Sequence, residues 1–487
     1  MQTVDIDMYT ECFILFDECE KLVQDVHYRD SIREPMNDFF RFQNKALISA
    51  TPIVPEKDSR FDGFMRVLIQ PDYVYRQKLK LITTNNVLET LQEVIEAKRG
   101  TVCIFCNSID SIDSFYRLIP ELSNACTFCS EDGQYKLWKG NRRKKSMMIT
   151  ELERYNFFTS RFYSAVDILC KNPPHVIFVS DLYGAAQSVI DPATEAIQII
   201  GRFRGGVNSV THIASIRPEL ECMSSSEIDH WIQGASTIFN GWKAQLARTT
   251  NIGERTLLQE AIGENSYLPY LDENGKPDSF LIANFYEKEQ VKRLYTSADL
   301  LHLAYEQTGY FVFSHEERLM PVSDNERMAI QHRLAKKKRA ELIVRKLEEM
   351  EKMSKATDKK IQKRYQRMLM NLITSTADRY IYDCFCRFGA EFVREADYNE
   401  NKLRTALNVS SEHTIKKSGQ MRTYIQRAFP VGAEISVQEA KSMLRQVYKK
   451  MGLNTGRGIT TKELEQYAEI ENSRNREARM IKILKHK

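Results

Sequence analysis

Acidic and hydroxyl side chains follow two short apolar runs near the start of the chain, at the points where each run ends. Asp17 and Glu18 come directly after Phe-Ile-Leu-Phe, and Ser49 and Thr51 follow Ala-Leu-Ile. Such runs are typical of buried parallel strands, whose carboxyl ends meet at one edge of a sheet.

Carboxylates at that edge can bind Mg²⁺ and orient a water for attack on a nucleoside triphosphate. We therefore expect Asp17 to hold Mg²⁺ through a water and Glu18 to polarise the attacking water. The hydroxyls of Ser49 and Thr51 would link the nucleotide state to the rest of the molecule. The alternative is two core strands that merely end in polar residues.

These two segments resemble motifs II and III of superfamily 2 helicases, the DEAD/DEAH-box relatives, and three later segments resemble further motifs in the family's order. They are Val102–Ser108 for motif IV, Phe158–Ile168 for motif V, and Ile197–Arg204, with its Gln-x-x-Gly-Arg pattern, for motif VI. The resemblance implies two α/β RecA-like lobes around a cleft that binds ATP and Mg²⁺. It also implies a motor on single-stranded or forked DNA, with RNA as an open alternative, similar to replication helicases of phages and mobile elements.

The resemblance assigns roles to individual side chains. Arg202 and Arg204 would stabilise the transferring phosphoryl group, because a guanidinium stays charged and grips phosphate oxygens in pairs. Besides Ser49 and Thr51, the residues expected to couple to ATP are Asp167, Gln198 and Gly201, and those expected to contact nucleic acid are Asn107, Ser108 and Thr159. The fourth residue of the acid motif is Glu20, where the named boxes have Asp or His.

The glycine-rich phosphate loop of this family, Gly-x-x-x-x-Gly-Lys-Ser/Thr, does not occur in the 487 residues. We therefore expect the first RecA-like lobe to be incomplete and the second to be complete. Two interpretations stay open. A separately encoded N-terminal helicase half could supply the loop, or the chain could be a catalytically inactive, helicase-derived DNA-binding or assembly subunit.

The composition is that of a large globular protein with several domains, because 42% of the residues are hydrophobic and 28% are charged. No apolar run approaches the length of a membrane span, and the first residues lack the pattern of a signal peptide. We therefore expect no membrane partner and a cytoplasmic location. The net charge of +5 is modest, so nucleic acid would have to be held by local basic patches.

Two basic patches stand out. In the run 136–145, Trp138 lies among Lys and Arg side chains, a composition suited to single-stranded nucleic acid. The contacts expected from this run are Lys139, Arg142 and Arg143. The run Lys336–Arg339 lies in a long helix that we expect to begin at a capping box formed by Ser323 and Glu326 and to run toward Met353. This helix would be either a solvent-exposed basic face or an arm that follows phosphates.

Two Cys-x-x-Cys pairs, Cys103 with Cys106 and Cys126 with Cys129, have a spacing that permits a structural zinc site. A zinc-dependent DNA-binding protein is therefore a third hypothesis. The first pair encloses an apolar strand pattern, however, and residues i and i+3 of a strand point to opposite faces. We expect buried thiols and no zinc.

The expected domain order follows from these segments. The expected boundaries are 1–57 for the remnant of the first lobe, 75–217 for the second lobe, 220–320 for an α+β accessory region with a hairpin around Asn274-Gly275, 321–395 for a basic long-helix region, and 420–487 for a small helical, winged-helix-like module. In the last module, Ser436 and Thr460 each precede a helical pattern with Glu three residues later, which is typical of a helix start.

Overall fold

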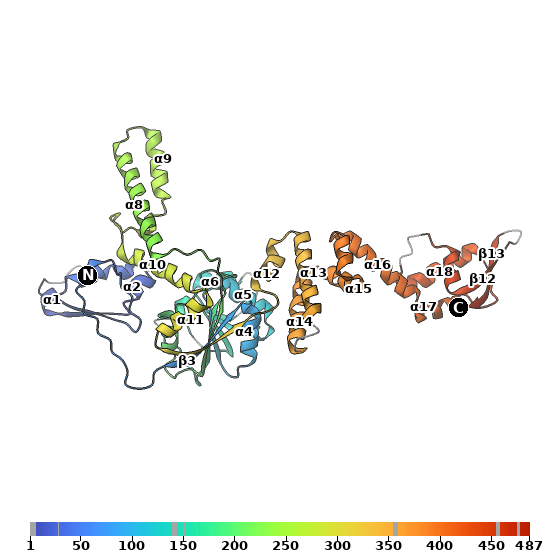
Figure 1. The fold of residues 1–487 in the computed structure, drawn as a ribbon, viewed down its shortest axis with the longest axis horizontal. Helices are drawn as coiled ribbons and strands as arrows, with labels where there is room; N and C mark the ends of the chain where they lie inside the picture. The colour runs from blue at the N-terminus through green and yellow to red at the C-terminus, as the bar shows by residue number, and fades with distance from the viewer. Residues whose placement is uncertain are drawn as a thin grey trace. The chain divides into compact units, whose positions relative to one another are not determined.

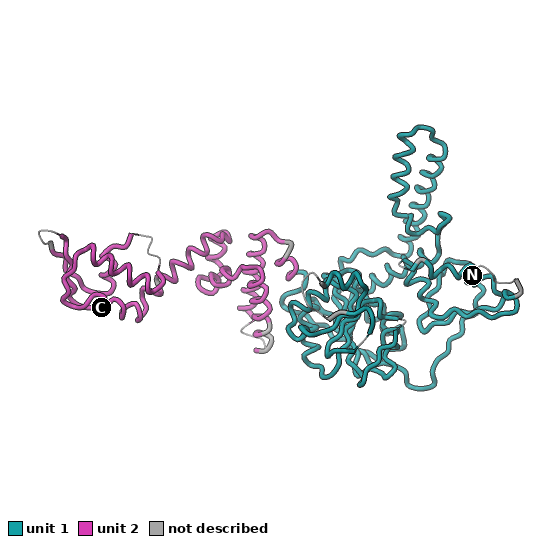
Figure 2. The backbone as a smooth tube through the Cα atoms, turned by 180° about the vertical axis from the view of Figure 1, so that it is seen from behind, with its two compact units in different colours: residues 1–325 teal, residues 326–487 magenta. Residues whose placement is uncertain are grey.

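The computed structural model describes residues 6–27, 29–138, 144–149, 151–164, 166–353, 359–453, 458–474 and 478–487. The chain divides into two compact units, residues 1–325 and 326–487, which are treated separately below (Figure 2).

The first unit is built around an eight-stranded, entirely parallel sheet in the order β10-β3-β9-β8-β4-β7-β5-β6. Its strands are β3 (Gln77–Thr84), β4 (Val102–Phe105), β5 (Cys126–Phe128), β6 (Lys144–Ser146), β7 (Tyr155–Phe158), β8 (His175–Ser180), β9 (Ser209–Ser215) and β10 (Phe311–Arg318). The helices between them are α4 (Val87–Glu96), α5 (Ile109–Leu118), α6 (Glu131–Trp138), α7 (Glu195–Gly201), α10 (Ser279–Leu294) and α11 (Ala298–Gln307). The expected α/β fold is confirmed.

Helices cover both faces of this sheet, as the continuous apolar strands require. On one face Ile104 of β4 packs with apolar side chains of α4 and α5. On the other face Phe105 packs with α7 and with Tyr305 of α11. A buried polar chain lies on this second face, where His212 binds Ser180 Oγ through Nε2 (3.1 Å) and Tyr305 Oη through Nδ1 (2.7 Å). Burial lowers the pKa of His212 to about 3, so this imidazole is neutral at ordinary pH.

A second, two-stranded parallel sheet pairs β1 (Phe13–Asp17) with β2 (Asn44–Ile48), and Asp17 lies opposite Ile48. Three short helices accompany it: α1 (Ile6–Glu11), α2 (Lys21–Gln24) and α3 (Pro35–Arg41). One face of the sheet packs Phe16 against the buried Phe39. On the other face Phe13 is 64% exposed, Leu15 53% and Ile48 46%. The expected adjacency of the two strands is therefore found, but the expectation that both are buried is wrong, because only one face of this small sheet is covered.

The first unit extends beyond the expected boundary at residue 217. Strand β10 pairs with β3 in the large sheet, and α10 and α11 supply the connection that precedes it. The expected turn at Asn274-Gly275 is present, with Gly275 at φ +73° and an antiparallel bridge between Leu271 and Pro277. The expected second arm of a hairpin is instead the start of α10, because Asp278 caps that helix by accepting from Phe280 and Leu281 N–H.

One long helix, α10, connects the small sheet to the large one, and a hairpin of two long helices stands apart from the large sheet. Helix α10 packs Phe280 and Leu281 against the small sheet, and Tyr295, which follows α10, is buried in the core of the large one. Helices α8 (Ser225–Arg248) and α9 (Ile252–Gly263) form a hairpin that stands clear of the large sheet (Figure 1).

The second unit is mainly helical, as expected for the C-terminal region. Its helices are α13 (Lys336–Met353), α14 (Lys359–Ser375), α15 (Arg379–Glu395), α16 (Glu400–Lys416), α17 (Gly419–Ala428) and α18 (Val437–Lys450). The helix expected to run from Ser323 to Met353 is interrupted, because α12 (Asp324–Met328) is followed by a π-helical turn (Ala329–Arg333) before α13 begins.

The last part of this unit has a core of its own, around Leu444 and Ile481. It contains a three-stranded antiparallel sheet in the order β11-β13-β12, made of β11 (Glu434–Ser436), β12 (Ala468–Arg474) and β13 (Arg479–His486). Thr460 caps a short 3₁₀-helix, Thr461–Gln466, rather than an α-helix. Within the described ranges, no helix of either unit is both long and apolar enough to cross a membrane.

Candidate functional site

The acidic segment turns sharply where β1 ends. Asp17 is the last residue of the strand, and its Oδ1 accepts from Glu18 N–H at 2.9 Å. Glu18 has φ +53°, a left-handed conformation that is uncommon for a residue other than glycine. Cys19 N–H then bonds Ile48 O at the end of β2 (3.3 Å). This turn leaves the carboxylate of Asp17 exposed at the carboxyl edge of the small sheet.

Two polar side chains, from Gln198 of α7 and from Arg202 at the C-terminal end of that helix, lie at this edge of the small sheet. Gln198 and Arg202 lie four residues apart and therefore on the same helix face, and Arg202 Nε bonds Gln198 O at 3.1 Å. Arg202 Nη1 lies 3.9 Å from Glu18 Oε1, and the arginine side chain is only 15% exposed. The acid and the arginine expected on opposite sides of one cleft thus lie side by side.

The Gln198 amide joins α7 to the segments that follow β1 and β2. Its Nε2 donates to Glu20 Oε1 at 2.7 Å and to Thr51 Oγ1 at 2.8 Å. Its Oε1 accepts from Lys21 Nζ at 3.1 Å. Glu20, Thr51 and Gln198 are all buried, so these bonds form where water competes little. We call this set of bonds the Gln198 network.

The sequence analysis did not predict the cation of this network, Lys21. Lys21 is buried, and its ammonium group bonds two amide oxygens, Gln24 Oε1 (2.7 Å) and Gln198 Oε1. Gln24 in turn donates to Thr194 Oγ1 at 3.0 Å. The only signal in the sequence is the position of Lys21 directly after the acids, and a lysine at that position is more often exposed.

Glu20 retains one free oxygen. Its Oε2 is buried and has no hydrogen-bond partner among the described residues. Together with the exposed carboxylate of Asp17, it offers oxygen donors of the kind that Mg²⁺ prefers. Carboxylates are the donor type that a magnesium site at the end of β1 would use.

Buried acids lie just before α7 and were also missed. Asp191 N–H bonds Glu195 Oε2 at 3.0 Å, and Thr194 Oγ1 donates to Asp191 Oδ2 at 2.5 Å. Burial raises the pKa of Glu195 to about 7, and burial with the charges of Asp191 and Glu195 raises the pKa of Glu287 in α10 to about 7. The N-terminal side of α7 therefore contains carboxyl groups that change charge near neutral pH.

Four further residues expected to act in nucleotide coupling or catalysis lie outside the Gln198 network. Arg204 is exposed and pairs with Asp167, with 3.0 Å between Nε and Oδ1. Ser49 Oγ accepts from Thr51 N–H at 2.9 Å and so shapes the turn after β2. A Cβ atom at Gly201 would meet no atom within 4 Å, so packing does not require glycine there.

Two of the six expected nucleic-acid contacts are engaged within the fold. Ser108 is buried and caps α5 by accepting from Ser111 N–H at 3.1 Å. Thr159 is buried and donates to Phe128 O at 3.4 Å. Asn107 is half-buried. The remaining expected contacts, Lys139, Arg142 and Arg143, lie outside the described residues.

All four cysteines of the two Cys-x-x-Cys pairs are buried. Cys103 belongs to the core on one face of the large sheet and Cys106 to the core on the other. Burial raises the pKa of both thiols. Two thiols on opposite faces of one strand cannot bind the same ion. Within the part of the chain that the structure describes, no group of three or more His, Cys, Asp or Glu side chains could hold a metal ion.

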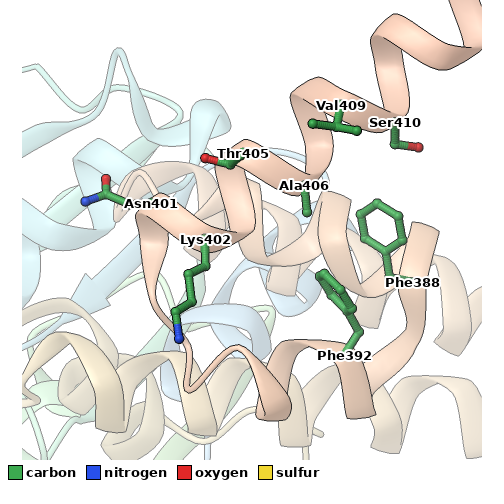
Figure 3. Close-up of a pocket in the computed structure, with 8 residues that line it drawn as sticks. All are labelled: Phe388, Phe392, Asn401, Lys402, Thr405, Ala406, Val409 and Ser410. Atoms are coloured by element: carbon green, nitrogen blue, oxygen red, sulfur yellow. The ribbon is translucent and has the colours of Figure 1, made fainter.

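A separate apolar pocket of about 820 Å³ lies between α15 and α16 (Figure 3). Phe388 and Phe392, whose ring centroids are 4.7 Å apart, line it together with Ala406 and Val409. Lys402 is the charged residue of its lining, so the pocket offers apolar contact rather than acid, base or nucleophilic chemistry.

Neither a protein-family model nor a curated protein sequence matches the chain.

Proposed function

We propose that residues 1–325 form the ATP-hydrolysing core of a nucleic-acid motor similar to superfamily 2 helicases, with RecA-like lobes. The observation that supports this most directly is the meeting of three distant segments at one edge. Glu18 lies 3.9 Å from Arg202, and Gln198 bonds both Glu20 and Thr51. A buried amide shared by an acid, a hydroxyl and an ammonium group is costly unless its bonds are made, so it specifies one arrangement of these three segments.

In this proposal each side chain has a distinct task. Asp17 holds Mg²⁺ through a water, and Glu18 orients the water that attacks the terminal phosphate. Mg²⁺, when bound, supplies positive charge that offsets the triphosphate. Arg202, already held by the Gln198 carbonyl, is positioned to stabilise charge on the transferring group, and Arg204 could join it only by leaving Asp167. The Gln198 network would transmit the change in nucleotide state between the two sides of the cleft.

In this proposal the motor moves on single-stranded or forked DNA, with RNA as the open alternative. It acts in replication, in the cytoplasm. Nucleic acid would pass Asn107 and the loop that contains Thr159. The buried hydroxyls of Ser108 and Thr159 serve the fold, so backbone groups and neighbouring cations would make most contacts.

We further propose that a separately encoded polypeptide, an N-terminal helicase half, completes the small sheet. Parallel strands are normally covered on both faces, and a two-stranded sheet is marginal alone. Phe13, Leu15 and Ile48 form an exposed apolar face on β1 and β2. A partner that adds parallel strands and an apolar cover would also be suited to bring the phosphate loop to Asp17.

A second candidate is a catalytically inactive, helicase-derived DNA-binding or assembly subunit. The packing of α10 favours it. Asn284 of α10 donates to Val23 O of α2 at 2.7 Å, while Tyr295 Oη donates to Ile190 O, in the loop before α7, at 2.6 Å. A helix fixed to both sides would resist the opening and closing that a motor cycle requires.

The deciding experiment measures ATP hydrolysis with Mg²⁺ and single-stranded DNA, using the full chain alone and after coexpression with the product of the reading frame directly upstream. We expect no turnover alone and turnover in the complex. Arg202→Ala should abolish it, whereas Arg248→Ala, at an exposed arginine of α8, should not. Turnover that survives Arg202→Ala would overturn the assignment of the cleft, and a stable complex without turnover would favour the inactive subunit.

A further inference from the structure

The second unit carries most of the positive charge of the chain. Residues 326–487 contain 36 Lys and Arg and 20 Asp and Glu, a net formal charge of +16, whereas the whole chain has +5. A charge of this size on one unit indicates a polyanionic partner unless the unit neutralises it internally.

The most conspicuous basic run is neutralised within the unit. Three of its four residues bind carboxylates on neighbouring elements: Lys336 pairs with Glu400, Lys337 Nζ lies 2.6 Å from Asp397 Oδ1, and Arg339 Nε lies 2.6 Å from Asp378 Oδ2. These pairs hold α13 against α15 and α16. The α13 run is therefore a poor candidate for an arm that follows phosphates.

The last 69 residues differ, because most of their Lys and Arg side chains that the structure describes make no ion pair. Residues 419–487 contain 14 Lys and Arg and seven Asp and Glu. On α18, Ser442, Arg445, Gln446 and Lys449 are all exposed. Their spacing of i, i+3, i+4 and i+7 places them on one helix face. None of these four side chains makes a hydrogen bond or ion pair with another described residue. We call these four residues the α18 face.

The opposite side of α18 fixes this face in place. Ala440, Leu444 and Val447 are buried in the core of the module, which also includes Ile481 of β13. Ser436 caps the helix by accepting from Glu439 N–H at 3.2 Å. A rigid helix with a polar, cationic outer face thus stands on a small sheet, beside the β12–β13 hairpin.

We propose that the α18 face docks in the major groove of duplex DNA. The groove is wide enough to admit an α-helix, and the four side chains are donors suited to phosphates and base edges: arginine and lysine to phosphate or guanine, glutamine to adenine, and serine to either. The positive charge complements the DNA backbone. This site lies in the second unit, so it goes beyond the proposed cleft and needs no nucleotide.

The test is binding of the full chain, without ATP, to a short fluorescein-labelled DNA duplex, followed by anisotropy between about 50 and 200 mM salt. The double variant Arg445→Ala/Lys449→Ala should lower the slope of log affinity against log salt by about 2 and weaken binding about 10- to 60-fold at 0.1 M salt. The matched control Lys336→Ala/Lys337→Ala removes the same charge from paired cations. It should change the affinity less than about 3-fold and leave the slope unchanged, because those cations are already offset.

Each other outcome would overturn the proposal. Equal weakening by the two double variants would show that net charge, not the α18 face, governs binding. An unchanged affinity in Arg445→Ala/Lys449→Ala, with the far-ultraviolet circular dichroism of the wild type, would show that the face is not used. Tighter binding to duplex RNA, whose major groove is too narrow for a helix, or to vesicles of anionic phospholipid would assign the positive charge to a different partner. None of these readouts depends on ATP hydrolysis, so they are separate from the test of the cleft.

Discussion

Gln198 is the residue whose removal tests most directly whether the two sides of the cleft are coupled. The variant Gln198→Ala deletes the donor to Glu20 and Thr51 and one of the two acceptors of Lys21. Lys21 keeps Gln24, but Glu20 loses the side-chain donor to its Oε1, and its Oε2 has no partner among the described residues. Both charged groups are buried, so water can replace the lost bonds only by entering the space that the Gln198 side chain leaves.

The expected cost follows from these two charges. A hydrogen bond to a charged group contributes about 1.5 to 3 kcal/mol, so losing one at Glu20 and one at Lys21 should cost about 3 to 6 kcal/mol locally. Entry of water would bring the cost toward the lower value. A local change of about 3 kcal/mol raises the population of the open state by roughly 150-fold, since 1.4 kcal/mol corresponds to a factor of ten.

Amide hydrogen exchange of the full chain, read by mass spectrometry, measures this opening. Peptides covering α2 and α7 should exchange roughly 100-fold faster in Gln198→Ala, while peptides of β8 and β9 should change little. Gln245→Ala, at an exposed position in α8, is the matched control and should have no effect on either set. If α2 and α7 keep their protection in Gln198→Ala to within about 3-fold, the network does not hold the cleft together and the reasoning is refuted.

Three further predictions concern other parts of the first unit. The folded-state pKa of Glu195, about 7, lies above its ordinary value of 4.5, so its stabilising contribution is present below about pH 4.5 and is lost as the pH rises through 7. Glu195→Gln should therefore flatten the fall of urea-unfolding free energy over this range, and an unchanged pH profile would show that the carboxyl is ionised throughout. Ser224→Ala removes the hydroxyl that accepts from Glu227 N–H at the start of α8 but keeps the backbone N–H that donates to the Glu227 carboxylate, and it should cost about 1 kcal/mol in chemical denaturation, whereas Ser225→Ala should cost almost nothing. Leu15→Ser, on the exposed face of the small sheet, should change the unfolding free energy by less than about 0.5 kcal/mol and lower the fluorescence of a bound hydrophobic dye; a larger loss of stability would mean that this face is covered.

The sequence predicted local features better than distant partnerships. The apolar runs before Asp17 and Ser49 correctly indicated two neighbouring strands with polar residues at one edge. A continuous apolar run does not say whether both faces are covered, and for this reason the exposure of Leu15 was not foreseen. The strand-face argument for Cys103 and Cys106 depends only on local geometry, and the structure does place them on opposite faces.

Features that depend on contacts between distant residues were missed. Strand β10 joins the large sheet beside β3, although more than 220 residues separate them along the chain, and no local pattern shows that pairing. The basic run of α13 indicated free cations, but its partners Glu400, Asp397 and Asp378 lie on later elements. Lys21 was missed for the same reason, because its burial is set by Gln198, 177 residues away.

The anchoring of the small sheet by α10 has a consequence for synthesis of the chain. Asn284 and Val23, whose bond fixes α10 to α2, are 261 residues apart. At ordinary translation speeds the ribosome needs roughly 13 to 50 s to add that many residues. During that interval the nascent segment that contains Phe39 lacks the Phe280 and Leu281 side chains that complete its core. A chaperone that shields this segment until α10 emerges would therefore raise the yield of folded protein.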